Sequence, residues 1–157
     1  MGERGDPSRT AGGGDYALQA VSGSPSANGR AFVRFSLPTI PSRCTLSTAT
    51  LRLYTDAADR GRTIGAYRAD PAAPLWTEAA LNWTNRPSAV GTAATAVTVD
   101  TSGYLTWTVT AHVQTLYAGI NNGFVLRDEL ESSGTTFRQQ YHSRDASFPP
   151  QLIVSWA

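Results

Sequence analysis

The chain has 157 residues, a hydrophobic fraction of 41%, and 13 basic and 12 acidic side chains that give a formal net charge of +1. This length fits one domain that can bury a core without a disulfide, and the single cysteine excludes an intrachain disulfide in any case. Because the net charge is close to zero, no strong electrostatic attraction to nucleic acid is expected. Because the sequence has no apolar run of about 18 residues, we expect no membrane insertion either.

The first 15 residues differ in composition from the rest of the chain. They are rich in Gly, Pro, Ser and charged side chains, show no apolar periodicity, and include three consecutive glycines. Glycine-rich polar sequences hold no regular element well, because the backbone keeps too many conformations open. We therefore predict a flexible arm or linker over residues 1–15 and a folded domain over residues 16–157.

From residue 16 onward, short segments of alternating polarity are separated by turn signals, as in half-buried strands. The alternation is clearest in residues 30–36, where Arg30 and Arg34 share one face, and in residues 46–54, where apolar side chains share one face. The predicted strands cover residues 17–21, 30–36, 46–54, 63–68, 94–99, 104–109, 123–127, 136–141 and 151–156.

One segment, residues 110–119, has the pattern of a helix. Thr110 is a candidate N-cap, apolar side chains follow at spacings of three and four, and Gly119 is a typical stop. Many short strands with one short helix indicate an all-β fold. We predict a jelly-roll-type β-sandwich of two antiparallel sheets.

Several linked motifs occur in the order of a known family. They are the strand at residues 30–35, the stretch at 48–54, the tryptophan pair at 76–83, the segment at 122–128, Ser143-Arg144-Asp145, and the closing segment at 150–156. In this order they resemble the DNRLRE domain, a β-sandwich of secreted bacterial and archaeal surface proteins. The resemblance implies an extracellular or cell-surface location in a bacterium.

Two departures from the DNRLRE pattern stand out. Asp145 occupies a position where that family usually has Glu, which shortens the reach of the carboxylate. The family's usual first strand, before the stretch at residues 18–21, has no counterpart in the polar residues 1–15. An open sheet edge is normally paired or covered, and strand addition is a known binding mode. We therefore predict completion by a strand from a partner chain or a second copy.

The densest charged set lies at the ends of adjacent predicted strands and consists of Arg127, Asp128, Glu131, Arg144 and Asp145. Arginine–carboxylate pairs that lock loops together are the interpretation we favour, because buried arginines are stable only when paired. The alternative is a polar groove for sugar hydroxyls or uronate carboxylates. A structural calcium ion is not supported, because the sequence has no Asp-rich loop with the spacing of a calcium site, so no cofactor is predicted.

Aromatic side chains offer a second set of candidates. Large rings usually fill sandwich cores, but flat aromatic faces also stack on sugar rings. Trp76, Trp83, Trp107 and Trp156 are the tryptophans, and a platform could equally come from Tyr67, Tyr104, Tyr117 and Tyr141. The candidate ligand-binding set is therefore Trp76, Trp83, Tyr141, Arg127, Asp128, Glu131, Arg144 and Asp145.

Catalysis is poorly supported. The neighbours His142 and Ser143 would point to opposite faces of a strand, which argues against a serine–histidine pair. We predict a non-catalytic extracellular interaction or assembly module, completed by a partner's strand. The alternative is a carbohydrate-binding module that recognises a polysaccharide.

Overall fold

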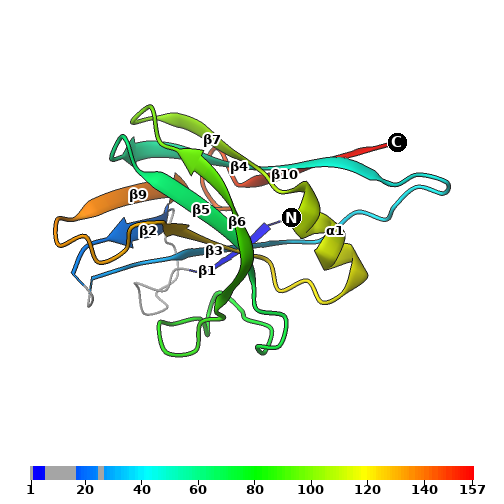
Figure 1. The fold of residues 1–157 in the computed structure, drawn as a ribbon, viewed down its shortest axis with the longest axis horizontal. Coiled ribbons are helices and arrows are strands. Elements are labelled where there is room, and N and C mark those ends of the chain that lie inside the picture. Colours follow the sequence, from blue (N-terminus) through cyan, green and yellow to red (C-terminus); the bar gives the residue numbers. More distant parts are fainter. Residues whose placement is uncertain (1, 6–16, 25–26) are drawn as a thin grey trace.

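The computed structural model describes residues 2–5, 17–24 and 27–157, which form two antiparallel sheets and one helix (Figure 1). Sheet A contains, in spatial order, β1 (Gly2–Gly5), β3 (Ala31–Phe35), β8 (Phe124–Asp128), β5 (Thr63–Ala69) and β6 (Ala89–Val97). Sheet B contains β2 (Ala17–Ser22), β4 (Leu46–Ala58), β7 (Gly103–Thr108), β9 (Phe137–His142) and β10 (Gln151–Trp156). The predicted β-sandwich of two antiparallel sheets with one short helix is confirmed.

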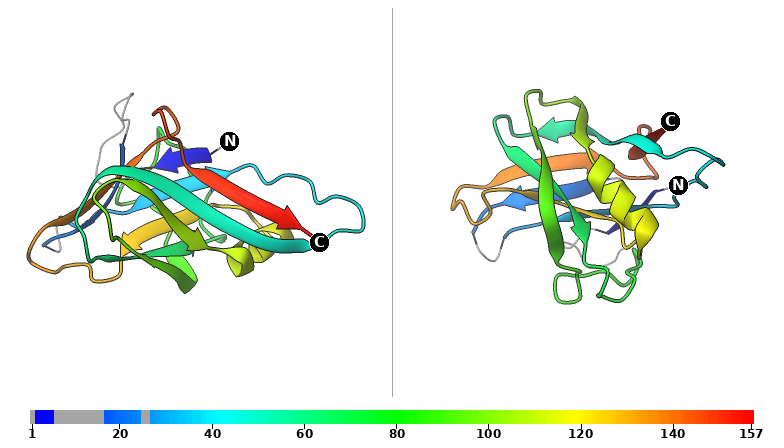
Figure 2. Two further views of the ribbon diagram at one scale, coloured as in Figure 1. Left: turned by 90° about the horizontal axis from the view of Figure 1, so that it is seen from above. Right: turned by 45° about the vertical axis from the view of Figure 1, so that its right-hand side comes forward.

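The long strand β4 organises sheet B (Figure 2, left). One of its edges pairs with β7 from Thr50 to Thr55. Its other edge pairs first with β10, up to Arg52, and then with β9, from Thr55. The strand therefore changes partners around Tyr54, and the loop over residues 143–150, which joins β9 to β10, leaves the sheet at that point.

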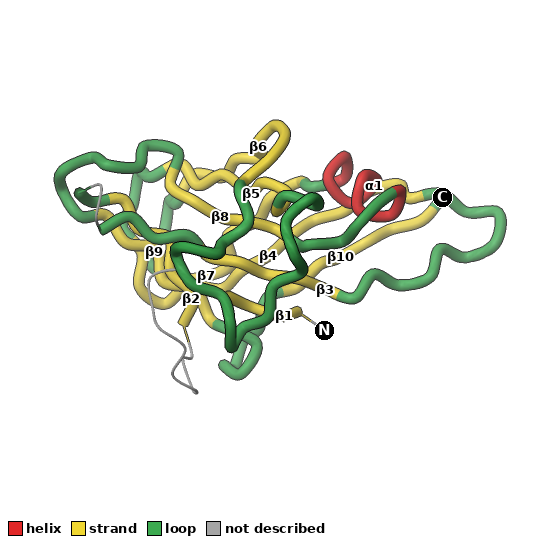
Figure 3. The backbone as a smooth tube through the Cα atoms, turned by 90° about the horizontal axis from the view of Figure 1, so that it is seen from below, coloured by secondary structure: helices red, strands yellow, loops and turns green. Residues whose placement is uncertain are grey.

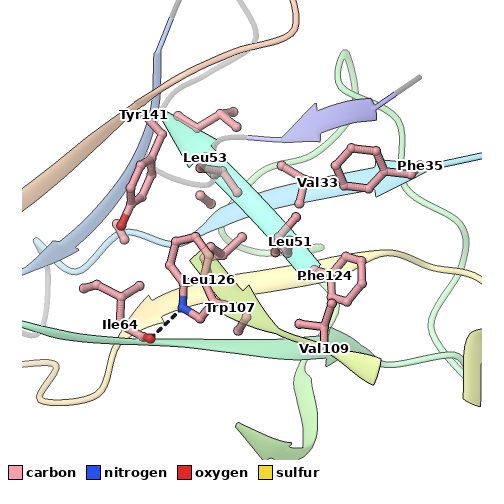
Figure 4. Close-up of a cluster of buried hydrophobic side chains, with 14 of the residues drawn as sticks. Val33, Phe35, Leu51, Leu53, Ile64, Trp107, Val109, Phe124, Leu126 and Tyr141 are labelled. Carbon is pink, nitrogen blue, oxygen red and sulfur yellow. Dashed lines mark hydrogen bonds between the residues drawn. The ribbon is translucent and has the colours of Figure 1, made fainter. Parts of the chain in front are cut away.

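The main core lies between the two sheets (Figure 4). Trp107 of β7 is fully buried there and stacks edge-on against Tyr141, with ring centroids 6.1 Å apart. Its indole Nε1–H donates to the backbone oxygen of Ile64 at 2.9 Å, a bond that crosses from sheet B to sheet A. A buried indole usually needs such a partner, so this bond both satisfies Trp107 and ties the sheets together.

A second apolar cluster covers the outer face of sheet A. The segment over residues 70–88 lies below this sheet in Figure 1 and in front of it in Figure 3. Its Trp76 and Leu81 pack on Phe32 and Val125 of the sheet, and Trp76 is only 5% exposed. The Trp76 Nε1–H donates to the Asn122 backbone oxygen at 2.8 Å. Sheet A is therefore covered on both faces.

The helix α1 (Thr110–Ala118) confirms the predicted helix within one residue. The proposed N-cap role of Thr110 is wrong, because the capping position is Val109, which makes no side-chain cap bond. The Thr110 hydroxyl instead accepts a hydrogen bond from the Ala49 amide at 3.0 Å and ties the helix start to β4. In the described part of the chain, no helix is long and apolar enough to cross a membrane.

The structure differs from the sequence prediction at the start of the chain. Residues 2–5, predicted as part of an arm, form the strand β1, which pairs antiparallel with β3 from Gly2–Phe35 to Gly5–Phe32. Ladder pairing uses backbone groups, and edge strands tolerate glycine and charge, so apolar periodicity gives no warning of such a strand. A segment of the same chain thus occupies this edge of sheet A. The rest of the predicted arm, residues 6–15, lies outside the described residues.

Candidate functional site

The outer face of sheet B is formed by alternate residues of its strands. On β4, Leu51 and Leu53 point into the core, whereas Arg52, Tyr54 and Asp56 point outward. This alternation is what the sequence predicted for the strand. Around these residues of β4, the outer face therefore carries aromatic and polar side chains.

Four rings gather on this face, and we call them the aromatic surface: Tyr54, Tyr104, His142 and Phe148. Tyr54 and Tyr104 are direct cross-strand partners and meet edge to face, with centroids 5.2 Å apart. Phe148, from the loop over 143–150, stacks on Tyr54 at 4.5 Å and remains 46% exposed. Cross-strand and stacked contacts of this kind hold the rings in fixed positions.

A hollow of about 300 Å³ lies beside the aromatic surface. It is lined by Asp56, Gln140, Tyr141, His142, Asp145, Ala146 and Ser147. The lining comes from β4, from β9 and from the loop that leaves the sheet where β4 changes partners. The interruption in strand pairing therefore creates the hollow next to the rings.

Polar groups mark the two ends of this face. At one end the Arg52 guanidinium lies 4.0 Å above the Tyr104 ring and donates to Gln151 Oε1 at 3.0 Å. At the other end His142 Nε2 is 3.0 Å from Asp56 Oδ2. Flat rings flanked by directional donors and acceptors are suited to a ligand that has apolar ring faces and many hydroxyls.

The three aromatic residues of the predicted set add no ring to the aromatic surface. Trp76 is buried under the segment that covers sheet A. Trp83 is half-buried on the same side, with the Arg86 guanidinium 3.6 Å from its ring centre. Tyr141 borders the hollow, but its ring is fully buried against Trp107, and this burial raises the pKa of its hydroxyl far above the usual range. These rings therefore do not share one surface.

The carboxylates of the charged set are held by arginines. Asp128 is 1% exposed and accepts bonds of 2.7 and 2.9 Å from Arg62. Glu131 accepts bonds of 2.8 and 2.9 Å from Arg30. Both are the bidentate pairs that the favoured interpretation predicted, although the partners come from other strands and loops than expected. The same bonds occupy the oxygens that a calcium ion would need, and no metal-binding cluster is found among the described residues.

The remaining charged residues separate into two places. Arg127 donates to the Tyr67 hydroxyl at 3.1 Å on the sheet A side, where burial is the main cause that raises the pKa of Tyr67. Arg144 contacts Glu78 at 3.1 Å and lies 3.9 Å from Asp145. Of the eight predicted site residues, Asp145 and Tyr141 line the hollow, and Asp145 is the one that is half exposed there.

The geometry gives no support to a serine–histidine pair. Ser143 is fully buried, and its hydroxyl accepts a bond from the Asp145 amide at 3.3 Å. The neighbouring His142 contacts Asp56 on the outer face instead. Adjacent residues at the end of a strand point to opposite sides, as the sequence indicated.

Sequence reasoning missed most of the aromatic surface. It named Tyr104 as one of several alternatives but did not single out Tyr54 or Phe148. The available signal was the alternation in β4, which puts Tyr54 on the polar face beside Arg52 and Asp56. No pattern in the sequence places Phe148, because its position depends on how the loop over 143–150 folds back.

One of two comparisons with known proteins gave a match. A search of curated proteins found no match to this chain. The model of carbohydrate-binding module family 96 matches residues 4–156, which is nearly the whole chain and includes part of β1. The chain therefore belongs to carbohydrate-binding module family 96.

Proposed function

We propose that this domain binds a polysaccharide on the outer face of sheet B and does not cleave it. The observation that carries the proposal is the aromatic surface beside a hollow lined with polar groups, in a member of a carbohydrate-binding family. Sugar rings can stack on Tyr54, Tyr104 and Phe148 while their hydroxyls bond to polar side chains. Polysaccharides lie mostly outside cells, which agrees with the extracellular location that we expected.

The face is long enough for more than one sugar unit. Arg52 and Asp56 are four residues apart on β4, which corresponds to about 13 Å along a strand. The rings lie between these two ends, and the hollow takes up the Asp56 end. A polymer can therefore run across the face, with one unit in the hollow and its neighbours on the rings.

Completion by a partner's strand, our first hypothesis, receives no support from the family match, which favours the carbohydrate-binding alternative. The edge of sheet A next to β3 is occupied by β1 of the same chain. We therefore do not include a partner strand in the proposed function.

The test is affinity gel electrophoresis of the chain against a panel of neutral, anionic and amino polysaccharides. Tyr104→Ala should weaken binding to the retained polysaccharide at least about tenfold, equal to about 1.4 kcal/mol. Tyr117→Ala is the matched control, since Tyr117 lies on α1, away from the hollow and the rings. Equal retention of both variants and the unmodified chain would contradict a binding site on sheet B.

A further inference from the structure

We infer that His142 is a positioning residue of the proposed binding site, because it holds the Phe148 ring in the plane that stacks on Tyr54. His142 thereby strengthens polysaccharide binding through Phe148 and does not itself present a ring face to the ligand. The inference rests on the proposed function, since it concerns the same face of sheet B. It adds a role for a side chain that the family match does not assign.

Phe148 depends on ring contacts for its position. It lies in the loop over 143–150, outside the strands, and no hydrogen bond joins it to the described part of the chain. Its ring centroid lies 4.5 Å from that of Tyr54, 5.9 Å from that of His142 and 6.5 Å from that of Tyr104. The orientation of Phe148 is therefore set by the rings around it.

The angles between the rings distinguish the contacts of Phe148. Its plane lies within 29° of the plane of Tyr54 and within 28° of the plane of His142, whereas Tyr104 meets it at 80°. A tilt of the Phe148 ring would disturb both near-parallel contacts at once. Removal of His142 leaves Tyr54 as the one near-parallel neighbour among these rings, so the tilt of Phe148 becomes less restricted.

The His142 ring is itself anchored without a ligand. It belongs to β9, and its centroid lies 4.9 Å from that of Tyr54. Its Nε2–H donates to Asp56 Oδ2 at 3.0 Å, since a carboxylate only accepts. Among the described residues, the buried Nδ1 has no partner, so the bond to Asp56 is the one that orients the ring. A ring fixed in this way on a strand can support a ring on a loop.

Exposure separates the roles of the two rings. The Phe148 side chain is 46% exposed, whereas the His142 side chain is 16% exposed. A sugar ring that stacks on this face therefore meets Phe148 and finds little of His142. For this reason we expect the effect of His142 on binding to pass through Phe148.

The first test follows the Phe148 ring in the ligand-free chain by NMR with carbon-labelled phenylalanine. The signals that are missing in Phe148→Ala belong to Phe148. Because neighbouring rings shift these signals, His142→Ala should move them toward the values of free phenylalanine. His112→Ala is the matched control, since the His112 ring lies 6.5 Å from Phe124. It should move the signals of Phe124 and leave those of Phe148 in place.

The second test measures affinity on gels that contain hydroxyethyl cellulose, polygalacturonate or glycol chitosan. For the polymer that retards the unmodified chain, Phe148→Ala should weaken the affinity by at least about tenfold. His142→Ala should weaken it about threefold to tenfold, the range expected for one aromatic pair. His142→Phe keeps a ring beside Phe148 and should restore the affinity to within about twofold of the unmodified chain.

A double variant shows whether His142 acts through Phe148. The variant His142→Ala with Phe148→Ala should bind no more weakly than Phe148→Ala alone, because residues that act through one contact are not additive. A weaker double variant would overturn the inference, since His142 would then act on the polymer by itself. Unmoved Phe148 signals, or unchanged affinity, in His142→Ala would also overturn it. Each of these results leaves the proposed function standing, whereas a chain that none of the gels retards overturns both.

Discussion

The two outer faces of the sandwich use similar residues for different purposes. On sheet A, the segment over 70–88 covers the face, and Trp76 is buried against Phe32 with ring centroids 6.0 Å apart. On sheet B, Tyr54 and Tyr104 meet at 5.2 Å on the outer face, where both rings are half-buried. An aromatic residue at an outward-facing strand position therefore either packs against another segment that covers it or can contact a ligand where no such segment lies over it.

Arginine shows a related contrast between the interior and the outer face of sheet B. The Arg62 side chain is only 12% exposed, lies over the Phe137 ring of β9 and pairs with Asp128, which points to the inner side of the sandwich. Arg52 on sheet B lies over the Tyr104 ring and holds Gln151, both of which belong to the exposed face. Substitutions of buried or covered residues should therefore act on stability, and substitutions on the outer face of sheet B should act on binding.

The largest expected effect is that of Trp76→Ala. Truncation of a buried tryptophan removes its apolar contacts and leaves a cavity, which costs about 3–5 kcal/mol in the free energy of unfolding. The lost bond to the Asn122 oxygen adds to this cost. Urea unfolding measures the change, with Tyr104→Ala as the comparison from the uncovered face. A loss for Tyr104→Ala as large as that for Trp76→Ala would break the contrast between the faces.

The Arg62–Asp128 pair gives the next effect in size. Arg62→Met leaves the Asp128 carboxylate buried without its partner, and such losses cost about 3 kcal/mol. The double variant Arg62→Met with Asp128→Leu should recover much of this loss, since no unpaired charge then remains. Thermal unfolding of the three variants tests the pair. A double variant no more stable than Arg62→Met would show that the cost has another origin.

Trp83→Ala tests which face binds sugar. The Trp83 ring is half-buried and has Arg86 at 3.6 Å, so its loss should cost about 0.5–1 kcal/mol of stability. We expect the retention of the chain on a polysaccharide gel to stay unchanged. A tenfold weaker retention with normal stability would place the binding site on the covered side. It would also support the sequence prediction that Trp83 belongs to the ligand-binding set.

The fold was largely predictable from the sequence, because it depends on local alternation. The pattern in residues 46–54 indicated both the strand and its two faces, and the spacing of apolar residues after Thr110 indicated the helix. The strand β1 was not predictable, since its pairing with β3 uses backbone groups that every sequence has. Capping by Thr110 also failed, because its hydroxyl is taken by Ala49 of another element.

The candidate site was less predictable because it depends on contacts between distant segments. Asp145 was named for its charge, but its position in the hollow follows from the path of the loop over 143–150. Tyr141 was named for its ring, yet it faces the core because Thr55 and Tyr141 pair across β4 and β9 on the inner side. Alternation predicts that two faces differ, but it does not say which face a later loop will cover.

The smallest expected effect is the pH dependence of stability that His112 causes. His112 lies on the sheet A side, whereas His142 lines the hollow on sheet B. His112 of α1 lies 6.5 Å from Phe124 on the sheet A side, and burial lowers its pKa below the ordinary value of 6.5. The unfolded chain therefore takes up this proton more readily than the folded chain. The contribution of His112 to stability is complete above about pH 6.5 and is lost as the pH falls below that value toward the lower pKa of the folded state.

Urea unfolding at pH values on both sides of 6.5 measures this loss. His112→Gln should flatten the decline in unfolding free energy at low pH, because it removes a group that binds its proton mainly in the unfolded chain. The same variant should bind polysaccharide like the unmodified chain, since His112 lies away from the hollow that His142 lines. A variant that keeps the full decline in stability would show that His112 does not cause it. A variant that loses binding would show that His112 also acts on the binding face of sheet B.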